Sequence, residues 1–150
     1  YIYDVVRDEF YHAKKDEGAY KNEVKLEHLS SELKLEESLL GMNHFWLCEN
    51  DLVDEQVMQN LVKTVRGTRS FGSAALEFAY VAEGIMDGYL AMGLSPWDIA
   101  AGMIIVNEVG GVTTNRHGDE VNMLERNSIV TCNQEIQRGI VEDFLIKGKK

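Results

Sequence analysis

The chain has 150 residues, 45% of them hydrophobic, and its 25 acidic and 15 basic side chains give a formal net charge of −10 at pH 7. This length suffices to bury one sizeable core, whereas the negative charge argues against a nucleic-acid-binding protein, which needs a basic face to displace counterions. No run of 18 or more apolar residues is present, so we expect no membrane partner. Cys48 and Cys132 stand alone in apolar contexts, so we expect both to be free thiols buried in the core of a soluble, cytoplasmic protein.

The first forty residues predict part of an antiparallel sheet. Residues 1–15 alternate apolar and polar side chains around a central VVRDE, which is typical of a hairpin, and residues 16–22 (DEGAYKN) are expected to form the next turn. The leucines of residues 23–40 fit neither a helical period nor a strict alternation. We expect a short strand at 33–35, a turn or brief helix over 36–39 and a second strand over 39–47.

Helices and strands alternate from residue 54 onward. The apolar periodicity predicts helices at 54–65, 70–84, 96–109 and 134–148, and strands at 86–93, 110–115 and 128–133. This alternation favours an α/β fold in which a mostly parallel sheet is covered by helices. We therefore divide the chain into the end of an antiparallel-sheet domain, residues 1–40, and an α/β domain, residues 41–150.

A single carboxylate, Asp98, precedes the apolar run of the third predicted helix. Ser95 can act as the N-cap of this helix, Pro96 fits its first position, and an acid three residues after the cap closes a capping box. Such a cap stabilises a helix by about 1 kcal/mol and would explain Asp98 without any function. The alternative is that Asp98 holds a cation, and the local pattern alone leaves both interpretations open.

Two separated blocks of sequence help to decide between these interpretations. The first has the pattern Trp-Asp-x-Ala-x-Gly followed by Glu-x-Gly-Gly and runs from Trp97 to Gly111. The second, Arg-x-x-Gly-Ser-Ala-Ala, runs from Arg69 to Ala75. The region 69–113 thereby resembles the C-terminal signature of the inositol monophosphatase family of magnesium-dependent, lithium-sensitive phosphatases. The opening YDVVRDEFYHAKKDEGAY is similar to a strand pair of the same family.

The resemblance implies a fold and a metal. The fold would be the C-terminal α/β half of the layered αβαβα inositol-phosphatase fold. Asp98 would bind a catalytic Mg²⁺, which takes oxygen ligands, activates water and neutralises phosphate charge. In this interpretation Asp98 keeps its capping bond through one oxygen. Glu108, at the far end of the same helix, is expected to be structural.

The resemblance also implies the substrate-binding residues. Gly72, Ser73 and Ala75 would line the pocket, although small residues at these positions also permit close helix packing. Ala91 stands seven residues before Asp98, where the animal inositol-phosphate enzymes carry a glutamate that contacts an inositol hydroxyl. The missing hydrogen bond is worth roughly 1–3 kcal/mol, which leaves other phosphate monoesters open as substrates.

The sequence departs from the family at a second motif, because no Asp-x-x-Asp-Gly occurs in it. We therefore expect the chain to be the C-terminal half of a longer enzyme and to be inactive alone. The predicted function is Mg²⁺-dependent hydrolysis of a small phosphate monoester resembling inositol-1-phosphate, carried out by a homodimer. The alternatives are a fructose-1,6-bisphosphatase, an NADP phosphatase or a phosphoadenosine phosphate phosphatase of the same fold group, and a non-catalytic module of this fold.

Overall fold

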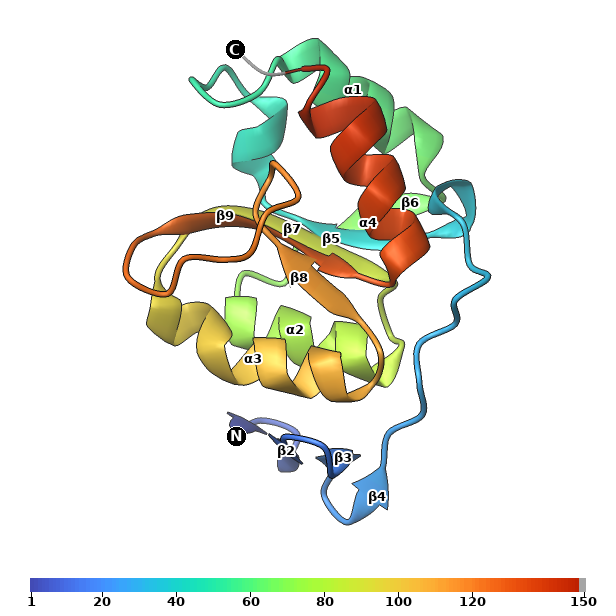
Figure 1. Ribbon diagram of the computed structural model, residues 1–150, viewed down its shortest axis with the longest axis vertical. Coiled ribbons are helices and arrows are strands. Elements are labelled where there is room, and N and C mark those ends of the chain that lie inside the picture. Colours follow the sequence, from blue (N-terminus) through green and yellow to red (C-terminus); the bar gives the residue numbers. More distant parts are fainter. Residues whose placement is uncertain (149–150) are drawn as a thin grey trace.

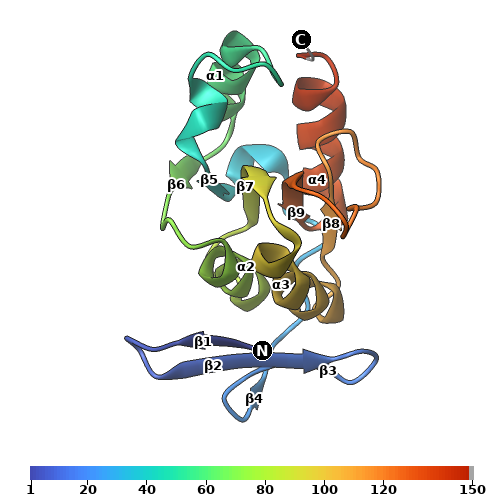
Figure 2. The same ribbon diagram turned by 90° about the vertical axis from the view of Figure 1, so that its left-hand side faces the viewer.

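Sheets and helices alternate in layers through the molecule, for which the computed structural model describes residues 1–148. Figure 2 shows the layers in the order sheet, helices, sheet, helices, with the N-terminus in the first layer. Every helix therefore packs against at least one sheet. This is the α/β architecture that the sequence predicts.

The first layer is a four-stranded antiparallel sheet in the order β1-β2-β3-β4. Its strands are β1 (Ile2–Asp4), β2 (Glu9–Lys14), β3 (Gly18–Lys21) and β4 (Val24–Lys25). The predicted hairpin is confirmed, but the predicted turn over 16–22 is wrong, because most of it is strand β3. Asp16 and Gly18 have positive φ angles of 64° and 89°, so the chain reverses just before β3 and strand pairing resumes at once.

The second sheet has five strands in the order β6-β5-β7-β9-β8. Strand β5 pairs in parallel with β6 and β7, whereas β9 is antiparallel to both β7 and β8. Within this sheet of the described chain, β9 alone runs against the others, so a mostly parallel sheet is confirmed in strand direction. Its strands are β5 (Leu39–Met42), β6 (Gly67–Arg69), β7 (Gly88–Leu94), β8 (Val112–Thr114) and β9 (Asn127–Cys132). The predicted domain boundary after residue 40 falls within β5.

Helices α2 and α3 fill the space between the two sheets, and α1 and α4 cover the other face of the five-stranded sheet (Figure 1). The helices are α1 (Glu55–Thr64), α2 (Ala74–Glu83), α3 (Pro96–Glu108) and α4 (Gln134–Ile140), which continues as the π-helix η3 (Val141–Leu145). All four predicted helices are present, although α2 begins later than the predicted residue 70. No helix within residues 1–148 combines the length and the apolar character needed to cross a bilayer.

The segment that joins the two sheets differs most from the prediction. Residues 33–35 form no strand, because the 3-10 helix η1 (Leu35–Glu37) begins at the last of them. Strand β5 is shorter than predicted, because the 3-10 helix η2 (His44–Leu47) replaces its second half. Distant groups hold the segment: the N–H of Leu29 donates to the carbonyl of Val109 at 2.9 Å, and the side-chain amide of Asn133 donates to the carbonyl of Ser30 at 2.6 Å.

Helices α2 and α3 approach each other closely at Gly102. A Cβ atom at this position would lie 2.3 Å from Cγ of Phe78 in α2, and Phe78 is fully buried. A distance this short leaves no room for even one methyl group. Gly102 therefore sets the spacing of the two helices between the sheets.

Replacing Gly102 by Ala should lower the free energy of unfolding by about 1–3 kcal/mol, because overpacking against Phe78 outweighs the better helix propensity of alanine. Urea unfolding of the variant and the wild type measures the difference. Ala100→Ser, at an exposed position of the same helix, is the control and should stay within about 0.5 kcal/mol of the wild type. A Gly102→Ala variant as stable as the wild type would contradict the close approach.

Candidate functional site

A cavity of about 390 Å³ lies at the edge of the five-stranded sheet where β5, β6 and β7 end. Asn43 follows β5, Ser70 follows β6 and Leu94 ends β7, and all three line the cavity. These strands run in parallel, so their carboxyl ends meet at one edge, where α/β sheets bind their ligands. Helix α2 follows β6 and helix α3 follows β7, so both helices begin at this edge.

The loop before α2, residues 70–73 (the α2 loop), forms one wall of the cavity. Gly72 has a φ of 79°, which a helix cannot contain. Oε1 of Glu77 accepts hydrogen bonds from the N–H of Phe71 at 2.8 Å and of Gly72 at 3.0 Å, and Ser73 is the N-cap of α2. These bonds hold residues 70–73 outside the helix, which explains why the predicted helix start at residue 70 is wrong.

Glu77 is the site residue that the sequence interpretation missed. Its side chain is 2% exposed, and Oε2 has no hydrogen-bond partner within residues 1–148. Burial raises the pKa of this carboxyl, while the bonds from Phe71 and Gly72 act in the opposite direction. A Cβ atom at Gly41 in β5 would lie 2.8 Å from Oε2, so the glycine makes room for the carboxylate. The signal that could have found Glu77 is a lone acid within the apolar run AALEFAYVA.

Asp98 lies in the first turn of α3, at the same edge of the sheet. The N–H of Ser95 donates to Oδ2 of Asp98 at 2.8 Å, and Pro96 begins the helix, so the predicted capping role is confirmed. This bond uses one oxygen and is compatible with a metal at Oδ1, a role that stays a prediction. Tyr89 lines the cavity, and its pKa is raised by burial and then by the carboxylates of Glu77 and Asp98. The charges of both carboxylates therefore influence the phenol of Tyr89.

The described residues do not complete a magnesium site. Residues 1–148 contain no group of three or more Asp, Glu, His or Cys side chains that could hold a metal ion. Asp98 offers one carboxylate, whereas Mg²⁺ takes a near-ideal octahedral set of oxygen ligands. Within residues 1–148, Asp98 is thus not joined by enough further side chains to make a metal-binding group, and its role as a metal ligand stays a prediction.

The four predicted substrate-binding residues lie in two kinds of place. Gly72 lines the cavity, and the hydroxyl of Ser73 accepts the N–H of Leu76 at 3.5 Å. Ala75 packs against the core between the two sheets, and Ala91 is fully buried within it. Gly72 and Ser73 thus belong to the α2 loop, whereas the side chains of Ala75 and Ala91 face the core. The substrate-binding role of all four stays a prediction.

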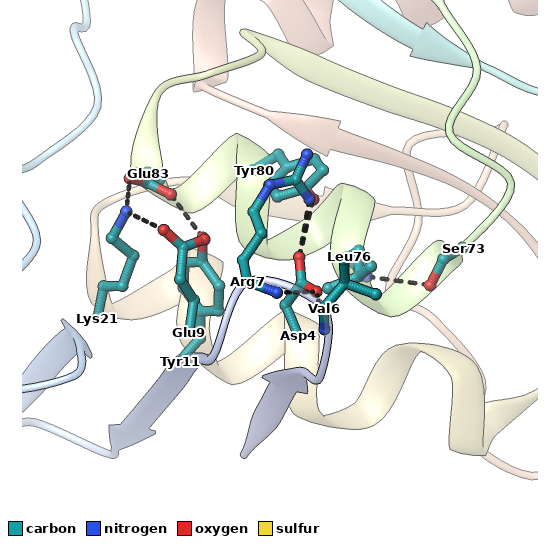
Figure 3. A network of polar contacts seen from close by, with 10 residues as sticks. All are labelled: Asp4, Val6, Arg7, Glu9, Tyr11, Lys21, Ser73, Leu76, Tyr80 and Glu83. Atoms are coloured by element: carbon teal, nitrogen blue, oxygen red, sulfur yellow. Dashed lines mark hydrogen bonds and ion pairs between the residues drawn. The ribbon is translucent and has the colours of Figure 1, made fainter.

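Two polar clusters tie α2 to the antiparallel sheet (Figure 3). In the first, Nη1 of Arg7 donates to Oδ2 of Asp4 at 2.8 Å and to the hydroxyl of Tyr80 at 2.6 Å, and Arg7 holds the pKa of Asp4 below its usual value. In the second, the hydroxyl of Tyr11 donates to Oε2 of Glu83 at 2.6 Å. Tyr80 and Glu83 belong to α2, so these clusters fix the helix that carries the α2 loop.

Glu108 ties the other end of α3 to the antiparallel sheet. Its Oε1 accepts the N–H of Asp16 and its Oε2 accepts the N–H of Gly18, each at 2.8 Å. These backbone bonds lower the pKa of the Glu108 carboxyl. The predicted structural role is therefore confirmed, with the turn between β2 and β3 as the partner.

Replacing Glu108 by Gln should destabilise the protein more at pH 7 than at pH 3. The folded-state pKa is lowered, so the carboxylate contributes stability above its unfolded-state pKa of about 4.3. That contribution is lost as the pH falls through the lower folded-state pKa, where wild type and variant converge. Urea unfolding at both pH values measures the difference.

The matched control for this experiment is Glu120→Gln, at an exposed position. Its difference from the wild type should be small and equal at the two pH values. A Glu108→Gln difference that does not change with pH would contradict the assigned bonds.

Comparison with known proteins identifies the relatives of this chain. A sequence model of the Inositol monophosphatase family matches residues 1–148. The chain belongs to this family. It is 50% identical over 144 residues to the inositol-1-monophosphatase of Bacillus subtilis (strain 168), an alignment that covers 96% of this chain and 54% of the relative. It is 39% identical over 90 residues to the fructose-1,6-bisphosphatase/inositol-1-monophosphatase of Thermotoga maritima, covering 60% of this chain and 33% of the relative.

The inositol monophosphatase fold is equally clear from structure. Staphylococcal SaIMPase-II, in its structure with bound inositol monophosphate, superposes with a TM-score of 0.90 at 36% sequence identity, over 97% of this chain and 55% of that chain. The predicted half of the layered phosphatase fold is thereby confirmed. The chain spans about half the length of the curated relatives it matches, for example 54% of the Bacillus subtilis protein. It is a member of a family of phosphatases.

Proposed function

We propose that this chain is the C-terminal half of a Mg²⁺-dependent phosphatase that hydrolyses a small phosphate monoester of the inositol-1-phosphate type. The observation that carries the proposal is that α2 and α3 both begin at the sheet edge where the cavity lies. The N-terminus of a helix presents backbone N–H groups and a partial positive charge, and both favour an anion. A phosphate ester suits this edge of the sheet.

The N-terminus of α2 is proposed as the phosphate-ester side of the site. The N–H groups of Phe71 and Gly72 already donate to Glu77. The first two N–H groups of the helix, at Ala74 and Ala75, have no acceptor within the helix, and Ala74 lines the cavity. Substrate oxygens are proposed to accept from these two groups. The small side chain of Ala74, which lines the cavity, lets a ligand approach the backbone.

The N-terminus of α3 is proposed as the metal side of the site. Asp98 would supply one ligand of Mg²⁺ through the oxygen that does not cap the helix. The further ligands would come from the part of the polypeptide that the relatives possess beyond the span of this chain. A bound Mg²⁺ would supply charge neutralisation and an activated water. Lithium sensitivity is proposed with it, on the strength of the family.

Fructose-1,6-bisphosphate is the second candidate substrate. Ala91 offers no polar side-chain group for an inositol hydroxyl, and the Thermotoga maritima relative is named for both activities. NADP and phosphoadenosine phosphate stay in the proposal as substrates that the same assay separates. A non-catalytic module would show itself by the absence of phosphate release from every one of them.

The partners are proposed to be a small phosphorylated substrate and a second copy of the chain, in the cytoplasm. The net charge of −10 disfavours nucleic acid as a partner. Cys48 and Cys132 are both free thiols, which fits a reducing compartment. Cys132 is buried, as predicted, whereas the predicted burial of Cys48 is wrong, because it is exposed in the loop after η2. The homodimer is proposed from the family resemblance alone, because α2 and α3, whose small residues suggested it, pack between the two sheets (Figure 2).

Asp98→Asn in the full natural polypeptide should lower Mg²⁺-dependent phosphate release by on the order of 100-fold or more, since a lost metal ligand removes several kcal/mol of transition-state stabilisation. The free energy of unfolding should change little, because the Asn side-chain oxygen can still accept from Ser95. Inositol-1-phosphate, fructose-1,6-bisphosphate, phosphoadenosine phosphate and NADP are assayed in parallel, with and without Li⁺. The chain of residues 1–150 alone should be inactive.

The control for the Asp98 experiment is Glu120→Gln, which removes one exposed carboxylate elsewhere and should leave the rate unchanged. Equal rates in the wild type and Asp98→Asn would leave Asp98 with its capping role only. Activity that does not depend on Mg²⁺ would contradict the proposed metal.

A further inference from the structure

Glu77 is a buried acid in an otherwise apolar part of α2, and packing alone does not require a carboxylate there. We propose that it is the positioning residue of the phosphate-ester site: its buried carboxylate holds the α2 loop so that the first N–H groups of α2 face the substrate. The proposal rests on the function proposed above. Glu77 also lines the cavity, and in this proposal it acts through the loop backbone.

One oxygen of Glu77 fixes two consecutive peptide groups. Oε1 accepts from the N–H of Phe71 at 2.8 Å and from that of Gly72 at 3.0 Å. Because both N–H groups donate to Glu77, neither is available to bind a ligand in the cavity. The positive φ of Gly72 is the backbone conformation that brings the two N–H groups to one acceptor. Without that acceptor, the α2 loop would lose the two hydrogen bonds that fix its backbone conformation.

The α2 loop also contacts a second residue of the same helix. The ring of Phe71 packs edge-on against that of Tyr80, with 5.1 Å between the ring centroids. Tyr80 in turn receives a hydrogen bond from Arg7, as Figure 3 shows. Residues one helical turn apart, Glu77 and Tyr80, thus hold the loop by its backbone and by its one large side chain.

Within the described residues, the other oxygen of the Glu77 carboxylate makes no hydrogen bond that would hold the loop. Oε2 is buried without a partner in residues 1–148, and a Cβ atom at Gly41 would contact it and the ring of Tyr89 together. The positioning therefore depends on Oε1 alone. A Gln side chain, which keeps one accepting oxygen at this place, should replace Glu77, whereas Met, of similar length and without a strong acceptor, should not.

The test compares Glu77→Gln and Glu77→Met in the full natural polypeptide with inositol-1-phosphate as the substrate. We expect Glu77→Met to raise KM about tenfold, the equivalent of one lost hydrogen bond, with kcat changed far less. Glu77→Gln should keep KM within about twofold of the wild type. Hydrogen exchange measured by NMR should show faster exchange of the Phe71 and Gly72 amides in Glu77→Met and unchanged exchange in Glu77→Gln.

A further variant covers the case in which Glu77→Met does not fold. Gly41→Ala keeps the acid but pushes on Oε2, so it should raise KM and speed exchange of the same two amides. Wild-type KM and amide exchange in Glu77→Met or, where only that variant folds, in Gly41→Ala would overturn the positioning role while leaving the proposed function intact. A wild type that releases no phosphate from any tested ester would overturn the proposed function and the positioning role with it.

Discussion

The burial of α2 between two sheets is the constraint on which the rest of this structure depends. Residues 77–82 of the helix are buried without interruption, so each polar side chain in or beside that run needs a partner inside the protein. Tyr80 finds Asp4 and Arg7, Glu83 finds Tyr11, and Glu77 finds the amides of the α2 loop. The shape of the loop at the cavity is therefore a consequence of how the helix is buried.

The sequence predicts best those helices whose N-termini carry a local capping pattern. Asp54 caps α1 by accepting the N–H groups of the first turn, and Ser95 with Pro96 starts α3, so local pattern suffices for both. The segment over 23–47 is held differently, because Ser30 and Leu29 find their partners at Asn133, the N-cap of α4, and at Val109, just after α3, rather than nearby. Its leucines pack against residues that are distant in the sequence, so local periodicity does not predict its structure.

Some parts of the candidate site can likewise be predicted from local sequence, and others cannot. Asp98 could be found because a cap pattern and a family motif coincide at one residue. The cavity could not, because Asn43, Ser70 and Leu94 are far apart in sequence and meet only when β5, β6 and β7 align. Glu77 could not be assigned either, since the periodicity of α2 identifies it only as an acid on a buried helix. Its partners depend on the path of the preceding loop.

Glu77 and Asp98 each use one carboxylate oxygen to hold the backbone at the start of a helix, and they differ in what becomes of the second. At α2, the second oxygen is enclosed beside Gly41 and Tyr89, so that N-terminus presents N–H groups and suits an anion. At α3, only the capping oxygen is bound by Ser95, and the carboxylate adds a negative charge beside the cavity. The proposed phosphate ester and cation suit this pair of unlike helix ends. The proposed division of the site into a substrate side and a metal side follows from that difference.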